Sequence, residues 1–210
     1  MIFEEVWALL IRTKRIVILG LLFGCLAAAP ASSQTTETIS DSGYEWSEKK
    51  QAARADLFAA LKDAENDAEA RQLEGLIWRL WFEPDDAEIA SRMKQVMELR
   101  RLGDYGRAME LIDEVIEIDP SYPESWNQRA TILFLYRDFD ASLEAVQETL
   151  KREPNHFGAL SGQMMIFLNQ GKPALARSSL LQALKVNPWL RERALLEKGQ
   201  VLSADRGVEL

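Results

Sequence analysis

The chain has 210 residues, and 47% of them are hydrophobic, which is enough for one domain with a sizeable core. Its formal net charge of −8 argues against general nucleic-acid binding, because that function needs a basic face to displace counterions from the phosphates. Cys25 is the only cysteine, so no intramolecular disulfide can form.

Residues 1–33 have the pattern of a secretory signal peptide. Three basic residues precede an apolar run over residues 16–26, and a string of small residues follows over 27–33. This order is typical of exported proteins, and the apolar run is too short for an ordinary membrane-spanning helix. We expect cleavage after Ala31 or, preferably, after Ser33, which would place the mature protein in the periplasm. The basic residues are Arg12, Lys14 and Arg15.

Two features of this leader leave other forms of attachment open. Glu4 and Glu5 stand ahead of the basic residues, where a cleaved signal does not favour acid, so either the true start lies further in or the leader remains as a membrane anchor. Cys25 follows Phe23-Gly24 in a setting similar to a bacterial lipoprotein signal, in which the cysteine is lipidated. That signal normally has a small residue where Phe23 stands.

Residues 34–44 are polar and rich in serine and threonine, which predicts a flexible lead-in. Residues 45–84 carry two amphipathic segments, which predict two helices. Their spacing does not match the repeat that follows, so we interpret this region as an N-terminal cap. Trp46 lies at its polar start and is expected to contribute little to stability. The cluster Ile77–Trp81 is an alternative partner-binding patch.

From residue 89 onward the sequence repeats with a period of 34 residues, which is the mark of a solenoid built from helix pairs. Three units, 89–121, 123–156 and 157–188, each hold two segments whose apolar residues recur at helical spacing. A proline closes each unit, because proline cannot continue a helix. The closing prolines are Pro120, Pro154 and Pro188, and the turns inside the units are Gly103-Asp104, Arg137-Asp138 and Gly171-Lys172.

The residues that recur at matching positions are Val96, Leu99, Gly103, Tyr105, Ala108, Val115 and Pro120 in the first unit; Trp126, Ala130, Leu133, Phe139, Ser142, Ala145, Thr149 and Pro154 in the second; and Leu160, Phe167, Gly171, Ala176, Ala183 and Pro188 in the third. This set resembles the tetratricopeptide repeat family. The resemblance implies an all-α, right-handed α-α superhelix over residues 85–188, with caps over 45–84 and over a helix and tail at 189–210. It also places Trp126 between its paired helices, facing Ser142.

The resemblance further implies that the first helix of each unit lines a concave groove for a peptide or protein partner. The methionines among the expected groove residues suit an adaptable groove, because their side chains are flexible. Arg100 and Arg101 favour a ligand that carries carboxylates near the first unit. The expected groove residues are Met93, Met97, Arg100, Arg101, Asn127, Thr131, Phe134, Leu135, Ser161, Met165, Leu168 and Asn169.

The sequence offers no catalytic constellation. His156 is the only histidine, it follows a Pro-Asn turn, and it is expected to start a helix, so neither a zinc site nor a base for a nucleophile is predicted. No phosphate-binding glycine loop is present. We therefore expect that the protein is not an enzyme and binds no cofactor or metal. We expect instead an interaction scaffold or adaptor of the bacterial cell envelope. The alternatives are a lipid-anchored assembly factor and an accessory subunit that binds through its caps.

Overall fold

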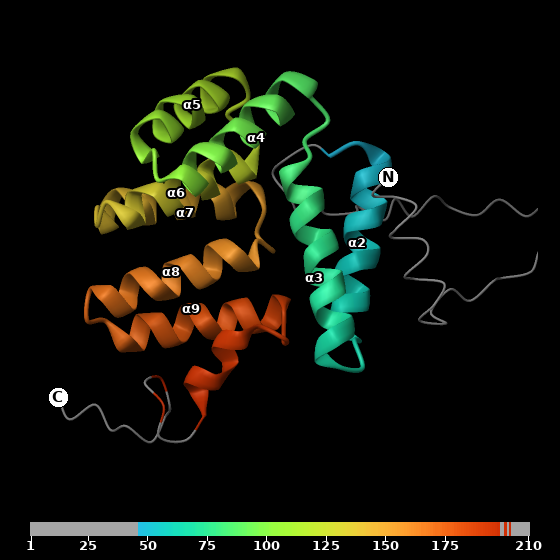
Figure 1. The fold of residues 1–210 in the computed structure, drawn as a ribbon. Helices are drawn as coiled ribbons and strands as arrows, with labels where there is room; N and C mark the ends of the chain where they lie inside the picture. Colours follow the sequence, from blue (N-terminus) through green and yellow to red (C-terminus); the bar gives the residue numbers. More distant parts are fainter. Residues whose placement is uncertain (1–45, 198–199, 201, 203–210) are drawn as a thin grey trace, which may run out of the picture.

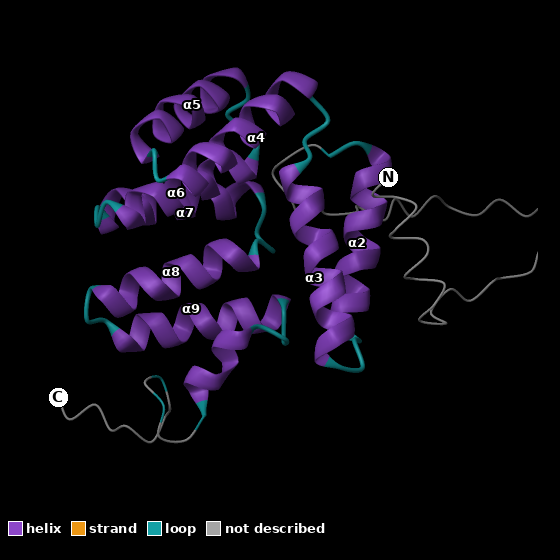
Figure 2. Ribbon diagram, viewed as in Figure 1, coloured by secondary structure: helices purple, strands orange, loops and turns teal. Residues whose placement is uncertain are grey.

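The protein is all-α in the part of the chain that the computed structural model describes, which comprises residues 46–197, 200 and 202 (Figure 1). No strand occurs within these ranges (Figure 2). The leader and the lead-in, with Cys25, lie outside the described residues. The helices are α2 (Glu48–Lys62), α3 (Asp67–Phe82), α4 (Ala87–Leu102), α5 (Tyr105–Ile118), α6 (Pro123–Leu135), α7 (Phe139–Arg152), α8 (Phe157–Asn169), α9 (Pro173–Val186) and the 3₁₀ helix η1 (Arg191–Leu196).

The helix pairs α4–α5, α6–α7 and α8–α9 form the three repeats and stack on one another, which confirms the predicted solenoid. The turn inside each pair has a residue with positive φ at the same position of the repeat. Gly103, Arg137 and Gly171 have φ values of 78°, 63° and 68°. Each of these residues lies within two residues of the end of the first helix of its pair, in the left-handed region, where glycine is the residue with no steric penalty. The 34-residue period therefore fixes backbone conformation as well as apolar spacing.

Arg137 is the one described non-glycine residue with positive φ. Its substitution tests whether left-handed strain in the turn lowers the stability of the protein. Arg137→Gly is expected to raise the free energy of unfolding by up to about 1 kcal/mol, because glycine removes the left-handed strain. The loss of the guanidinium contact with the Phe139 ring, at 5.6 Å, limits the gain. Urea denaturation measures the change. Gly171→Ala is the matched control and should lower stability by a similar amount; if both substitutions act with the same sign, turn strain does not govern this position.

We define α2 and α3 as the N-terminal hairpin. It was predicted to cap the repeats, but it does not cover the outer face of the first repeat. It stands beside the stack and crosses the ends of its helices (Figure 1). Three residues separated by the repeat period, Tyr122, His156 and Leu190, are buried at the loops that face it. The Tyr122 hydroxyl donates to the Trp81 carbonyl at 2.5 Å, His156 stacks on the Trp81 ring, and Leu190 joins the core of the hairpin.

The cap prediction was wrong in position because α3 carries apolar residues that fit these loops rather than the outer face of α4 and α5. Polar contacts fix the same arrangement. Arg54 of α2 forms a buried ion pair with Glu153, and the Asn187 side chain donates to Glu74 of α3 at 2.5 Å. Glu153 and Asn187 again occupy one position of the repeat. The hairpin therefore contacts the second and third repeats at equivalent places.

Two tryptophans exchange the roles that the sequence suggested. Trp46 is buried, with 6% of its surface exposed, and belongs to the core of the hairpin. Trp126 is only partly buried: its indole donates to the Pro120 carbonyl at 2.9 Å, and the Arg152 guanidinium lies over its ring. The paired helices approach closely at Ala130, whose carbonyl accepts from Ser142 Oγ at 2.8 Å. An indole cannot fit between them, so the predicted core position of Trp126 was wrong.

The chain after α9 differs from the helix predicted there. Residues 191–196 form the short 3₁₀ helix η1 instead of an α-helix. Beyond it, Leu202 is buried against α8 and α9 with Leu195 and Leu196 nearby. This segment thus covers apolar surface of the last repeat, as a cap would.

Candidate binding site

The concave face, which we define as the surface formed by α4, α6 and α8, is divided by α3 into a covered part and an open part. Trp78 of α3 lies 5.6 Å from the Phe157 ring, centroid to centroid. A Cβ atom at Gly158 would meet the Trp78 ring at 2.3 Å, so only glycine admits this approach. α3 therefore lies directly against the N-terminal end of α8.

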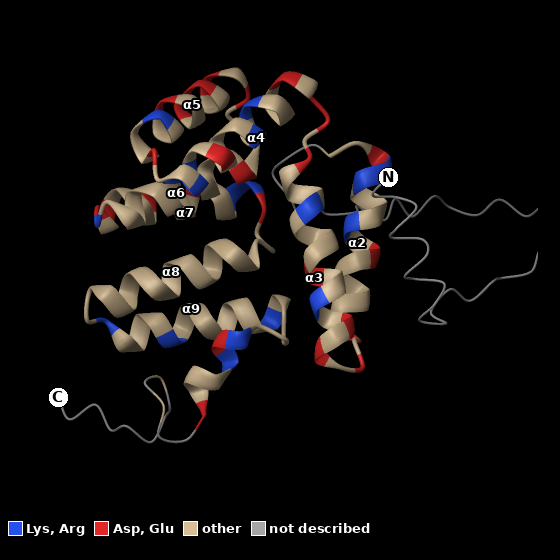
Figure 3. Ribbon diagram, viewed as in Figure 1, with Lys and Arg blue, Asp and Glu red and all other residues tan. Residues whose placement is uncertain are grey.

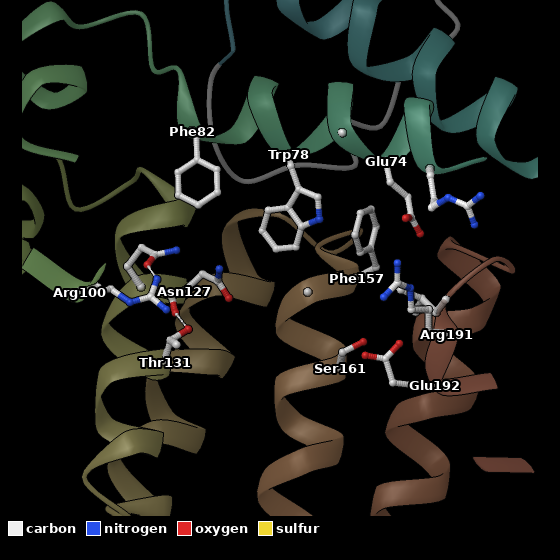
Figure 4. Close-up of a pocket in the computed structure, with 15 residues that line it drawn as sticks. Glu74, Trp78, Phe82, Arg100, Asn127, Thr131, Phe157, Ser161, Arg191 and Glu192 are labelled. Carbon is white, nitrogen blue, oxygen red and sulfur yellow. Dashed lines mark hydrogen bonds between the residues drawn. The ribbon is translucent and has the colours of Figure 1, made fainter. Parts of the chain in front are cut away.

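A cavity of about 730 Å³ remains between α3 and the repeat helices in the covered part (Figure 4). Trp78 and Phe82 extend from α3 toward α6 and α8, while Arg191 and Glu192 close the cavity from the segment after α9. The volume falls in the usual range for a small-ligand site. The full lining is Arg71, Glu74, Gly75, Trp78, Phe82, Arg100, Asn127, Gln128, Thr131, Phe157, Gly158, Ser161, Leu190, Arg191 and Glu192.

A buried polar network lies beside this cavity. The Glu124 carboxylate is fully buried and accepts from the side-chain amides of Asn127 and Gln128 and from His156 Nε2, the last at 2.9 Å. His156 Nδ1 accepts from the Ala159 backbone N–H at 3.0 Å, so in the neutral ring the proton is on Nε2 and is donated to Glu124. His156 thus starts α8, as predicted, and also links the start of α8 to α6.

Arg100 adjoins this network. Its guanidinium donates to the Gln128 side chain, and it lines the cavity from the C-terminal end of α4. Burial lowers the pKa of Arg100, while the negative charge of Glu124 acts in the opposite direction. Arginine nevertheless stays charged at neutral pH. The cavity therefore has a fixed, partly buried positive charge at one end.

The open part of the concave face is apolar. Met97, Leu135 and Met165 are 38%, 45% and 41% exposed, one on each of α4, α6 and α8. A hollow of about 150 Å³ lies between α6, α7 and α8, with Phe134 and Met165 among its walls. Leu168 is partly buried against the C-terminal segment. We call the surface of Met97, Phe134, Leu135 and Met165 the open half-groove.

The other predicted groove residues fall into three groups. Asn127 and Thr131 line both the cavity and the hollow, and Arg100 and Ser161 line the cavity. Arg101 and Asn169 are at the exposed edge, where Arg101 pairs with Glu98 of its own helix and the Asn169 amide donates to the Met165 carbonyl. Met93 is 1% exposed and belongs to the core of the first repeat, so its assignment to the groove was wrong.

Sequence reasoning missed the cavity residues contributed from outside the repeats. Trp78 stood in the aromatic cluster noted as an alternative patch, but nothing in the repeat pattern marks Arg71, Phe82 or Arg191. Gly158 was a usable signal, because glycine inside a helix suggests close approach of another element. Within residues 46–197 we find neither a helix long and apolar enough to cross a membrane nor a cluster of three potential metal ligands.

Comparison with known proteins supports the repeat assignment. The tetratricopeptide repeat family model matches residues 93–157 and 128–185. A TPR repeat-containing protein of Rhizobium etli is 32% identical over 136 residues, which cover 63% of this chain and 65% of that protein, or just under two thirds of its length.

Solved structures of MamA also match. The MamA RS-1 ArsTM double mutant is 16% identical, with a TM-score of 0.44 over 69% of this chain and 78% of that one, and a structure of MamA MSR-1 is 15% identical, with a TM-score of 0.42 over 67% and 78%. Stacked repeats of this family present extended concave surfaces, which suit the binding of other proteins. Residues 93–185 of the chain contain tetratricopeptide repeats.

Proposed function

We propose that this protein is a non-enzymatic adaptor of the bacterial cell envelope that binds an apolar segment of a partner protein in the open half-groove. The observation that carries the proposal is the exposure of Met97, Leu135 and Met165 on α4, α6 and α8, together with the hollow that Phe134 and Met165 line. Exposed apolar side chains on several helices of one face favour a protein contact. The whole of α8 carries no charged residue, which keeps this side of the groove free of competing ion pairs (Figure 3).

The hollow defines the side chain that would enter it. Its walls are mostly apolar, and Gly162 of α8 leaves open space above them, since a Cβ there would meet no atom within 4 Å. A leucine- or methionine-sized side chain suits about 150 Å³. Methionine side chains adjust their shape easily, so Met97 and Met165 can follow either a helical or an extended segment.

The location in the envelope rests on the leader pattern of residues 1–33, with a lipidated Cys25 as the alternative. Mass spectrometry of the protein from its native host tests it. We expect a mature N-terminus near Ser32 or Gln34. A lipid-modified Cys25 would favour a membrane-anchored assembly factor, and an intact Met1 in a cytoplasmic pool would contradict export.

The binding surface is tested with peptides selected from a random displayed library against the wild-type protein. Gly162→Leu should weaken the selected peptides at least tenfold, or by about 1.4 kcal/mol, because the new side chain fills the hollow. Leu135→Ala should weaken them less, and circular dichroism should show both variants folded, since neither change removes a buried group.

Gly75→Leu on α3 is the matched control. Gly75 also has open space around it, but it faces the covered cavity rather than the open half-groove. This variant should bind the selected peptides as the wild type does. Unchanged affinity in Gly162→Leu and Leu135→Ala would show that the partner uses another surface.

A further inference from the structure

The covered cavity contains hydrogen-bond donors that the protein itself does not use. Ser161 Oγ and Arg100 Nε are both buried, and neither has a hydrogen-bond partner among the described residues. Both line the same cavity. A buried donor without an acceptor is costly, and such atoms are uncommon in native structures. Two such donors in the lining of one cavity indicate a ligand that accepts hydrogen bonds there.

Two further guanidinium groups border this space without an ion pair. Arg71 lies on α3 and Arg191 on η1, and neither forms a hydrogen bond or salt bridge with a described residue. The nearby Arg193 differs, because it pairs with Asp67 at 2.9 Å. The lining thus holds three arginines against Glu74 and Glu192, and Glu74 already accepts from Asn187. In a chain of net charge −8 this is a local excess of positive charge.

The remaining walls are aromatic. Trp78, Phe82 and Phe157 face the cavity between the arginines, and the Trp78 and Phe82 rings stack at 5.9 Å (Figure 4). A planar guanidinium binds a carboxylate through two parallel hydrogen bonds, while the rings suit an apolar body. Charge, donors and apolar surface therefore favour one chemical class.

We infer that the cavity between α3 and the concave face is a second binding site, which takes a carboxylate carried on an apolar or aromatic body. The carboxylate lies between Arg71 and Arg191, and its body packs on Trp78 and Phe157. This site is separate from the open half-groove and uses residues of the N-terminal hairpin and of η1. It does not depend on the proposed adaptor function.

The test uses N-acetylphenylalanine as the ligand and N-acetylphenylalanine amide as the neutral control. Binding is followed through the Trp78 indole resonance in ¹H–¹⁵N spectra, identified with Trp78→Phe. The acid should shift this resonance saturably, and the amide should bind at least tenfold more weakly. Arg71→Gln and Arg191→Gln should each weaken the acid by about tenfold, as expected for loss of a charge-assisted hydrogen bond.

Two variants separate this site from general effects. Gly75→Leu should abolish binding of the acid, because the side chain enters the cavity without a clash, and it should leave peptides of the open half-groove unaffected. Arg107→Gln, on the exposed surface of α5, should leave both unchanged. Three results would each overturn the inference. They are equal binding of the acid and the amide, wild-type affinity for the acid in Arg71→Gln and Arg191→Gln, and no binding of the acid at millimolar concentration.

The source of the carboxylate is resolved with a tetrapeptide that ends in phenylalanine. Tighter binding of the free peptide than of N-acetylphenylalanine, with loss on amidation, would assign the site to the C-terminus of a protein chain. Binding of the single residue with exclusion of the peptide would assign it to a small carboxylic acid. Both results support the site.

Discussion

Glu153→Ala is expected to lower the free energy of unfolding by about 3–5 kcal/mol, the range for breaking a buried ion pair. The Glu153 carboxylate is fully buried and accepts from Arg54 Nε at 2.6 Å and from the Asn155 backbone N–H at 3.1 Å. The substitution leaves the Arg54 guanidinium, itself 8% exposed, without its counter-charge between the hairpin and the second repeat. Guanidinium chloride denaturation followed by circular dichroism measures the loss.

Glu148→Ala, on the same helix, is the matched control and should cost about 1 kcal/mol or less. Glu148 pairs with Lys151 and Arg152 at the surface, and its hydrogen bond from Lys151, followed by that from Arg152, lowers the pKa of the carboxyl. Exposed pairs of this kind contribute little. The double variant Arg54→Met with Glu153→Met should be more stable than Glu153→Ala. Similar losses for Glu153→Ala and Glu148→Ala would contradict this account of the hairpin contact.

Trp81→Ala is expected to cost about 3–5 kcal/mol, because it opens a large cavity where the hairpin meets the repeats. The Trp81 ring is fully buried, stacks on His156 at 3.9 Å with an interplanar angle of 11°, and lies 4.9 Å from the Phe157 ring. The midpoint of thermal unfolding and the urea denaturation curve both report the change.

Trp81→Phe tests the reason for that loss. The Trp81 indole nitrogen has no hydrogen-bond partner among the described residues, so phenylalanine keeps much of the apolar contact and removes an unused donor. It should cost far less than alanine. Trp126→Ala, at the partly exposed position, should also cost clearly less. If Trp126→Ala proves as damaging as Trp81→Ala, the contact between hairpin and repeats is not the main core.

The stack of helix pairs was predictable because its signals are periodic. Gly103, Arg137 and Gly171 share a left-handed conformation, and their position could be read from the 34-residue spacing alone. The docking of the hairpin carries no such signal. Tyr122, His156 and Leu190 occupy one repeat position but differ in chemistry, so aligning the repeats does not reveal that all three face α3.

The candidate site was predictable to the extent that the repeats alone form it. Leu135 and Met165 are exposed on α6 and α8, two of the helices that the resemblance assigns to the groove. Met93 and Asn127 are buried, Met93 in the core of the first repeat and Asn127 at the covered end of the face. Two of the cavity arginines, Arg71 and Arg191, come from α3 and η1, which lie outside the repeats and far from each other in sequence, and only the three-dimensional structure brings them together.

The contacts of the hairpin change how this solenoid is expected to fold. In a simple repeat array each unit touches only its neighbours, so units can form and open one at a time. Here three residues of the hairpin form hydrogen bonds with residues far along the chain. Arg54 bonds to Glu153, 99 positions away, Glu74 to Asn187, 113 positions away, and Asp67 to Arg193, 126 positions away. During synthesis the hairpin must therefore wait, with its apolar face unmatched, until the third repeat has been made. Contacts of such long sequence separation slow folding, and they join the two ends of the array into one cooperative unit.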